Sequence, residues 1–161
     1  MVDIQQPAAI REMPTEVKGR LLNDHGGLEG SLAQLACAID EADPQQLCEQ
    51  WTQFELNLRD HLDTEERFLF PLVATAHRKD VEELRAEHRH IRSALSELGI
   101  AVDLHTLRKA SVDELIVYLQ RHAAREEHSL YQWTDHNEAA KRGLRAMFER
   151  RMPHVAVTSH E

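Results

Sequence analysis

Two pairs of residues in this sequence have the types and spacing that suit a metal site. His61 and Glu65 stand four residues apart, as do His122 and Glu126, so the members of each pair share a helix face. Both pairs interrupt stripes of apolar residues at helical spacing. Burying an imidazole and a carboxylate among leucines is costly unless the groups are paired or bind a metal. A metal is therefore the simplest explanation for two such pairs in one chain.

Two further apolar stripes contain one histidine each. His25 follows Leu21 on the first stripe, and His88 follows Leu84 on the third. A single histidine on such a stripe is more often a hydrogen-bonded core residue than a ligand, but six polar residues on all four stripes favour a shared metal site. Their nitrogen and oxygen atoms suit iron, manganese or zinc. The predicted ligands are His25, His61, Glu65, His88, His122 and Glu126.

Several neighbours of these residues are assigned no ligand role. His90 lies about 200° around its helix from the predicted ligand and is expected to face solvent. Glu66 and Glu127 directly follow the two predicted ligand glutamates and are also expected to face solvent. For Tyr118, one turn before His122, a half-buried packing role is favoured over that of a hydrogen-bond donor directed toward the metal.

Four long segments with apolar residues at helical spacing must position the predicted ligands. The second is expected to begin at Pro44, after Asp43 as a cap, and Pro71 is expected to kink or loosen its last turns. The expected helices cover residues 15–41, 44–76, 80–99 and 111–133, and Asp135 with Glu138 predicts a short fifth helix to about residue 151. The sequence thus predicts an all-α four-helix bundle with a short C-terminal helix.

The predicted boundaries of the third and fourth helices come from short local patterns. Asp80 with Glu83, and Ser111 with Glu114, have the spacing of capping boxes, and Gly99 is typical of a helix end. The domain organisation expected from these helices is an N-terminal arm over 1–14, the bundle over 15–135, and a C-terminal helix and tail over 136–161.

Composition excludes several classes of function. The chain has 161 residues, with 19 Lys and Arg against 28 Asp and Glu, so its formal charge of -9 has the wrong sign for a nucleic-acid or anionic-membrane binder. No stretch reaches the length of a membrane span, and the N-terminus lacks a basic region followed by an apolar run, so a cytoplasmic protein is expected. Cys37 and Cys48 lack CxxC spacing and are expected to be reduced.

The order of these motifs resembles a known family. His25, HLDTE (His61–Glu65), EH (Glu87 and His88) and HAARE (His122–Glu126) resemble the hemerythrin-like HHE cation-binding domain over roughly residues 15–135. The resemblance implies an up-down-up-down bundle and two iron ions, bridged by carboxylates and by an oxo or hydroxo group.

The sequence departs from the oxygen-carrying hemerythrins on the third helix. Those proteins have two histidines four residues apart there, whereas the residues four from His88 are Leu84 and Arg92, so one nitrogen ligand is missing. The motif of the fourth helix ends at Glu126, where the carriers have an aspartate one residue later. The chain is more similar to the bacterial and iron-sensing branches, which handle oxygen, nitric oxide, peroxide or iron.

These observations predict a non-haem di-iron protein that binds, senses or detoxifies a small oxidant (O2, peroxide or nitric oxide) and does not carry O2 reversibly. Alternatives are a di-iron enzyme with catalase-like or peroxidase-like turnover, an iron-storage or iron-sensing bundle, and a bundle that uses its metal only for stability. A ferritin-like site is disfavoured because it needs two Glu-x-x-His pairs, and only Glu87 and His90 match. The HExxH motif of zinc proteases is absent.

Overall fold

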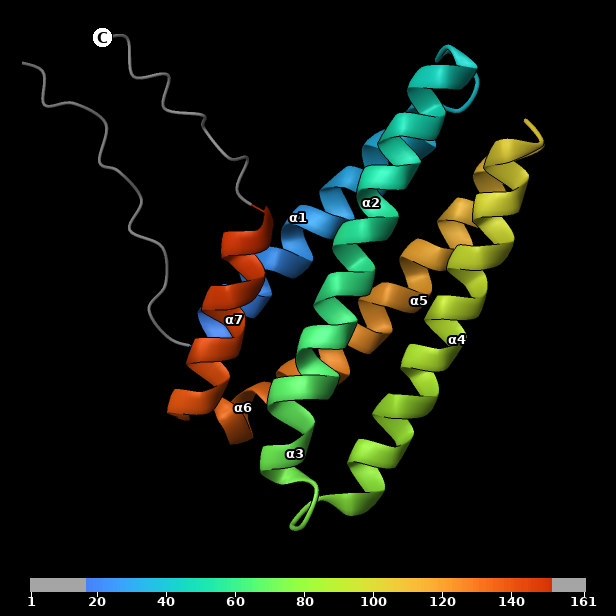
Figure 1. The fold of residues 1–161 in the computed structure, drawn as a ribbon. Helices are drawn as coiled ribbons and strands as arrows, with labels where there is room; N and C mark the ends of the chain where they lie inside the picture. Colours follow the sequence, from blue (N-terminus) through green and yellow to red (C-terminus); the bar gives the residue numbers. More distant parts are fainter. Residues whose placement is uncertain (1–16, 152–161) are drawn as a thin grey trace, which may run out of the picture.

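The computed structural model describes residues 17–151, which form helices and turns without a strand (Figure 1). The helices are α1 (Val17–Ala38), α2 (Pro44–Thr64), the π-helical turn η1 (Glu65–Leu69), α3 (Phe70–Val73), α4 (Arg78–Asp103), α5 (Lys109–Glu127), α6 (Leu130–Thr134) and α7 (Glu138–Arg151). The predicted arm over 1–14 and the last ten residues of the predicted tail lie outside the described residues.

Four helical rods run alternately up and down, with α2, η1 and α3 forming one of them (Figure 1). Around the bundle, α1 contacts α2, α2 contacts α4, α4 contacts α5, and α5 returns to α1. The predicted all-α, up-down-up-down bundle with a C-terminal helix is confirmed. Within residues 17–151, no helix combines the length and apolar character that crossing a membrane requires.

Two apolar clusters fill the bundle, one on each side of a polar layer. In α1, His25 lies between Leu21 of one cluster and Leu28 of the other. The rods of α2 and α4 repeat this order at their predicted ligands, whereas after α5 the second cluster begins only at Leu130 in α6. Because each large apolar side chain stabilises the fold by about 1.5–3 kcal/mol when buried, the two clusters hold the four helices in register on both sides of the polar layer.

The predicted end of the third helix at Gly99 is wrong, because α4 continues to Asp103. A Cβ at Gly99 would lie 3.3 Å from the Trp51 Nε1 atom, so this glycine permits a close helix contact. The helix ends one turn later, where His105 adopts a positive φ of 55°. The N–H groups of His105 and Thr106 donate to carbonyls of the last turn at 3.0 and 2.8 Å, which is a Schellman ending.

Both predicted capping-box starts are two residues late. α4 begins at Arg78 and α5 at Lys109, and neither has a side-chain cap. Ion pairs between residues one turn apart support these earlier starts: Arg78 lies 2.9 Å from Glu82, and Lys109 lies 2.6 Å from Asp113.

Asn137, not Asp135, caps the C-terminal helix. Its side-chain oxygen accepts a hydrogen bond from the N–H of Ala139 at 2.9 Å, and α7 begins at Glu138. Asp135 accepts from the N–H of Lys18 at 2.8 Å instead. This bond joins the start of α1 to the turn before α7.

The fourth long helix ends at Glu127, before its predicted end at Trp133. Two side chains contact backbone carbonyls of the preceding turn. The Nδ1 of His128 lies 2.6 Å from the carbonyl oxygen of Ala124, and the hydroxyl of Ser129 donates to that of Arg125 at 2.8 Å. Such local bonds compete with a continuing helix. The chain turns and resumes as the short helix α6, whose Tyr131 is fully buried.

Pro71 loosens the second rod, as predicted. The turn before it, η1, is π-helical, and the N–H of Phe70 donates to the carbonyl of Glu65, five residues back. A proline lacks an N–H and its ring collides with the carbonyl four residues earlier, so a wider turn accommodates it. Glu65, a predicted ligand, is the first residue of this turn.

The C-terminal helix closes over this widened turn. α7 contacts α1, α2 and η1, and Gly143 faces the ring of Phe68. A Cβ at Gly143 would lie 2.3 Å from the Cγ of Phe68, closer than two such atoms can approach. The glycine is therefore required for α7 to pack here.

We expect Gly143→Ala to lower the free energy of unfolding by about 1–3 kcal/mol, the usual cost of overpacking a core. Urea denaturation measures it. Gly30→Ala is the matched control, because Gly30 is exposed in α1 and a Cβ there has no atom within 4 Å. That variant should be neutral or stabilised by about 0.5–1 kcal/mol. Equal stabilities of the two variants would contradict this packing of α7.

Candidate metal centre

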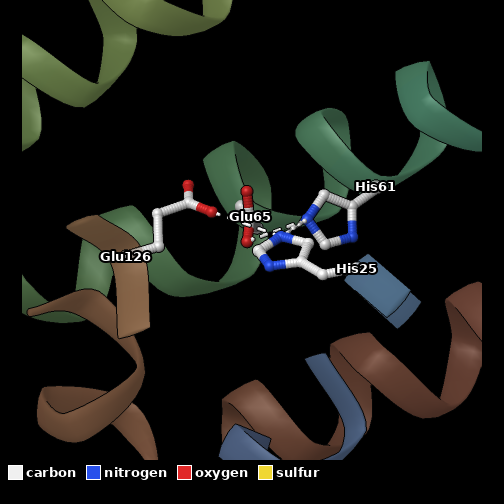
Figure 2. Close-up of side chains that lie close together, drawn as sticks. All are labelled: His25, His61, Glu65 and Glu126. Carbon is white, nitrogen blue, oxygen red and sulfur yellow. Dashed lines mark hydrogen bonds and ion pairs between the residues drawn. The ribbon is translucent and has the colours of Figure 1, made fainter. Parts of the chain in front are cut away.

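The structure brings all six predicted ligands together in the polar layer. They form two groups that could each hold a cation: His25, His61, Glu65 and Glu126 (Figure 2), and Glu65, His88, His122 and Glu126. We call these cluster A and cluster B. In each, one ligand atom per residue lies within 4.8 Å of the others. Glu65 and Glu126 belong to both clusters and are fully buried.

Each shared glutamate has one oxygen near each cluster. Glu65 places Oε1 3.2 Å from the Nε2 of His61 and Oε2 3.4 Å from the Nε2 of His88. Glu126 places Oε2 3.5 Å from the Nε2 of His25 and Oε1 3.0 Å from the Nε2 of His122. Carboxylates in this position are able to bridge two cations, as in other carboxylate bundles.

Two inward-facing atoms are buried without a hydrogen-bond partner. They are the Oε2 of Glu65 and the Nε2 of His122. The latter lies 3.0 Å from a Glu126 oxygen but makes no hydrogen bond with it. Buried polar atoms are rarely left unpaired in proteins. These two unpaired inward-facing atoms, one oxygen and one nitrogen, fit the ligands of a cation.

Carboxylates also face the outer ring nitrogens of three histidines. The Nδ1–oxygen distances are 2.7 Å for His61 and Asp24, 2.9 Å for His88 and Glu66, and 2.7 Å for His122 and Glu87. A carboxylate that accepts the Nδ1–H leaves the Nε2 lone pair directed inward, which orients the ring for a metal. His25 differs, because its Nδ1 is buried without a partner.

Arginines hold these three outer carboxylates in turn. Arg151 donates to Asp24, Arg92 donates to Glu66 at 2.7 Å, and Arg125 donates to Glu87 at 2.6 Å. Arg151 is the last residue of α7, so the C-terminal helix supplies one of these cations. Three chains of hydrogen bonds, each running from a histidine to a carboxylate to an arginine, therefore hold the orientation of the imidazoles that face the centre.

The prediction that Glu66 faces solvent is wrong. Its side chain is 27% exposed and accepts from both His88 and Arg92. Glu127 is more exposed, at 39% of its side chain, and pairs only loosely with Lys18, at 3.8 Å. Among the outer carboxylates, Asp24 has a signal in the sequence, since it follows Leu21 by three residues and so lies on the apolar stripe.

Tyr131 is a member of the site that the sequence analysis also missed. Its hydroxyl oxygen lies 2.7 Å from the Oε1 of Glu65, 2.8 Å from the Nε2 of His25 and 3.0 Å from the Oε2 of Glu126. The one indication in the sequence is general: a tyrosine that is buried needs a hydrogen-bond partner for its hydroxyl. The break after α5, which directs the ring inward, has no clear pattern in the sequence. His90 is exposed, as predicted, and packs on the half-buried Tyr118.

The family model of the hemerythrin HHE cation binding domain matches residues 19–134, with a second, overlapping match over 79–151. The chain belongs to this family. No curated protein matches it, and no solved structure does either. Membership in the hemerythrin family supports a cation in the polar layer, where clusters A and B lie.

The charges of this hemerythrin-like site compensate one another when no metal is bound. Burial lowers the pKa of His61, but the adjacent Glu65 and Asp24 carboxylates outweigh it and raise the pKa to about 10. The same opposition of burial and carboxylates raises the pKa of His88 to about 11 and that of His122 to about 9. These three imidazoles are therefore cationic at neutral pH in the metal-free protein.

We expect the melting temperature of the metal-free protein to fall as the pH rises from about 6.5 toward 10. A histidine whose pKa is raised by folding adds stability that is complete below its unfolded pKa of 6.5 and is lost as the pH rises through the folded value, about 10 for His61. Thermal melts of chelator-treated protein at several pH values measure this. Metal-loaded protein is the control, because there protons compete with the metal and stability should fall on the acid side. A constant melting temperature of the metal-free protein would contradict this charge pairing.

Proposed function

We propose that the protein is a non-haem di-iron protein of the hemerythrin-like type, which binds, senses or detoxifies a small oxidant such as O2, peroxide or nitric oxide. The proposed iron ligands are His25, His61, Glu65, His88, His122 and Glu126. The observation that carries the proposal is that Glu65 and Glu126 belong to both cluster A and cluster B. Two cations that share two carboxylates account for this geometry, whereas a single cation would leave two of the histidines unused.

Iron is proposed because the mixed nitrogen and oxygen ligands suit it and because the family resemblance implies it. When bound, iron would supply electron transfer and coordination positions for the oxidant. The chain supplies the rest. The outer carboxylates and arginines orient the imidazoles, the two shared glutamates would hold both metals, and the apolar clusters on both sides exclude bulk water.

A small cavity adjoins the centre and supports a small ligand. Its volume is about 40 Å³, and it is lined by His25, Glu29, His61, His122, Ala123 and four leucines, Leu28, Leu58, Leu62 and Leu119. A single water needs at least about 10–15 Å³, so the cavity suits a molecule of two heavy atoms. Its largely apolar wall favours a neutral ligand over an ion.

A surface hollow provides a route to this cavity. It lies between α1 and α5, has a volume of about 270 Å³, and shares His25, Glu29 and Ala123 with the cavity. The side chain of His25 is 15% exposed, whereas those of the other five proposed ligands are almost completely buried. A small oxidant would therefore approach beside His25.

Elemental analysis of protein expressed in iron-replete medium should give two irons per chain. Glu126→Ala should lose most of both, because each metal loses an oxygen ligand, while Glu127→Ala should keep two. The control removes the same charge one residue away, outside both clusters. A reproducible single metal, zinc alone, or equal losses in the two variants would contradict the di-iron proposal.

We expect the iron-loaded protein not to carry O2 reversibly, because the six proposed ligands supply only four protein atoms to each metal. His90 does not supply the missing nitrogen, since it is exposed on the far side of α4. Anaerobically reduced protein should convert in air directly to a stable ferric spectrum. An oxygenated spectrum that forms in air and returns to the spectrum of the reduced protein under vacuum would contradict this prediction. Steady-state consumption of added peroxide would distinguish turnover from binding.

A further inference from the structure

The hydroxyl of Tyr131 lies among the ligand atoms of cluster A. Its three closest polar neighbours are the Oε1 of Glu65, the Nε2 of His25 and the Oε2 of Glu126, all within 3.0 Å. These are the same atoms that face His61 and the rest of cluster A. The tyrosine ring has no exposed surface, so these contacts are made without competition from bulk water.

Hydrogen bonding does not satisfy these contacts. A phenol has one hydrogen, so Tyr131 is able to donate to Glu65 or to Glu126 but not to both. The phenol oxygen lies within 3.0 Å of one oxygen of each carboxylate, and both carboxylates are ionised. At least one of these two oxygen–oxygen contacts therefore has no hydrogen between its atoms. Such a contact is repulsive unless a cation lies between the atoms.

The distances fit the edges of a metal coordination shell. Metal–nitrogen and metal–oxygen bonds of about 2.1 Å that meet at right angles place neighbouring ligand atoms about 3.0 Å apart. The hydroxyl of Tyr131 lies 2.7 to 3.0 Å from its three neighbours. Within cluster A, the Nε2 atoms of His25 and His61 are 2.9 Å apart, and that of His61 is 3.2 Å from Glu65. The phenol oxygen is thus spaced as one ligand atom among five.

We propose that Tyr131 is a fifth protein ligand of the cluster A metal, which it binds through its phenolate oxygen together with His25, His61, Glu65 and Glu126. The inference rests on the proposed metal centre and extends it. As the oxygen–metal bond forms, the O–H bond breaks and the proton leaves to solvent.

This ligand makes the two metals unequal. Cluster A then supplies five protein atoms and cluster B four, so the metal held by His88 and His122 would keep more positions open, and His122 also lines the small cavity through which an oxidant would arrive. The nitrogen that the third helix lacks belongs to cluster B as well, because His88 is the α4 residue of that cluster. An anionic phenolate also favours the ferric over the ferrous ion by charge attraction. The expectation of irreversible oxidation therefore rests on the charge of this donor as well as on the number of open positions.

The chain offers a matched control, because Tyr118 and Tyr131 are its only tyrosines. The test compares wild type, Tyr131→Phe and Tyr118→Phe after loading with ferric iron, with metal content measured in each. A ferric phenolate absorbs visible light by charge transfer, and resonance Raman excitation in that band enhances tyrosine ring vibrations. We expect band and vibrations in wild type and Tyr118→Phe, and neither in Tyr131→Phe. Loading with Zn²⁺ gives a second readout, since only proteins with Tyr131 should show the near-ultraviolet difference spectrum of a tyrosinate.

The outcomes separate the two proposals. Wild-type protein with two irons but no phenolate band would overturn the role of Tyr131 and leave the di-iron centre intact, and this result does not depend on the folding of any variant. A band that persists in Tyr131→Phe, or disappears in Tyr118→Phe alone, would also overturn it. Wild-type protein that binds no metal would overturn the di-iron proposal and the tyrosine ligand with it.

Discussion

Two completely buried carboxylates set the conditions that the rest of this bundle must meet. Glu65 and Glu126 have no exposed surface, and each lies between the two apolar clusters. A buried carboxylate without a positive partner costs several kcal/mol, so the helices must bring cations to both. They bring four imidazoles, two to each cluster, and three of these, His61, His88 and His122, are cationic at neutral pH without a metal. The order of leucines and ligands along every long helix follows from this need, because the polar layer has to fall at one level.

The groups around the central imidazoles must also balance one another's charges. The imidazoles that face Glu65 and Glu126 need acceptors on their outer nitrogens, and Asp24, Glu66 and Glu87 provide them. Those carboxylates are themselves partly or fully buried and are paired with arginines. Because Arg151 is one of these, α7 is electrostatically part of the site although it contributes no proposed ligand. The packing of Gly143 on Phe68 and the pairing of Arg151 with Asp24 therefore serve the same centre.

Periodicity was sufficient to predict the bundle and the convergence of six residues, since both depend on which helix face is apolar. It was insufficient where tertiary contacts decide a local outcome. Gly99 resembles a helix end but lies inside α4 against Trp51. The capping-box patterns at Asp80 and Ser111 lie inside helices that begin two residues earlier, where ion pairs span the first turn. Tyr131 was missed for a related reason. A continuous fourth helix would place Leu130 on the interior stripe, and only the turn at Ser129 brings the tyrosine ring to the centre.

The raised pKa values of three histidines account for the charge balance of the metal-free bundle. Without metal, protonated His61, His88 and His122 offset the ionised carboxylates around them. A bound metal ion would take the place of those protons, so that loading would exchange one set of positive charges for another within the same layer. The carboxylates remain ionised throughout, since their neighbours keep the pKa of Glu126 well below its usual value despite burial. Loading would therefore place new cations among carboxylates that are already ionised.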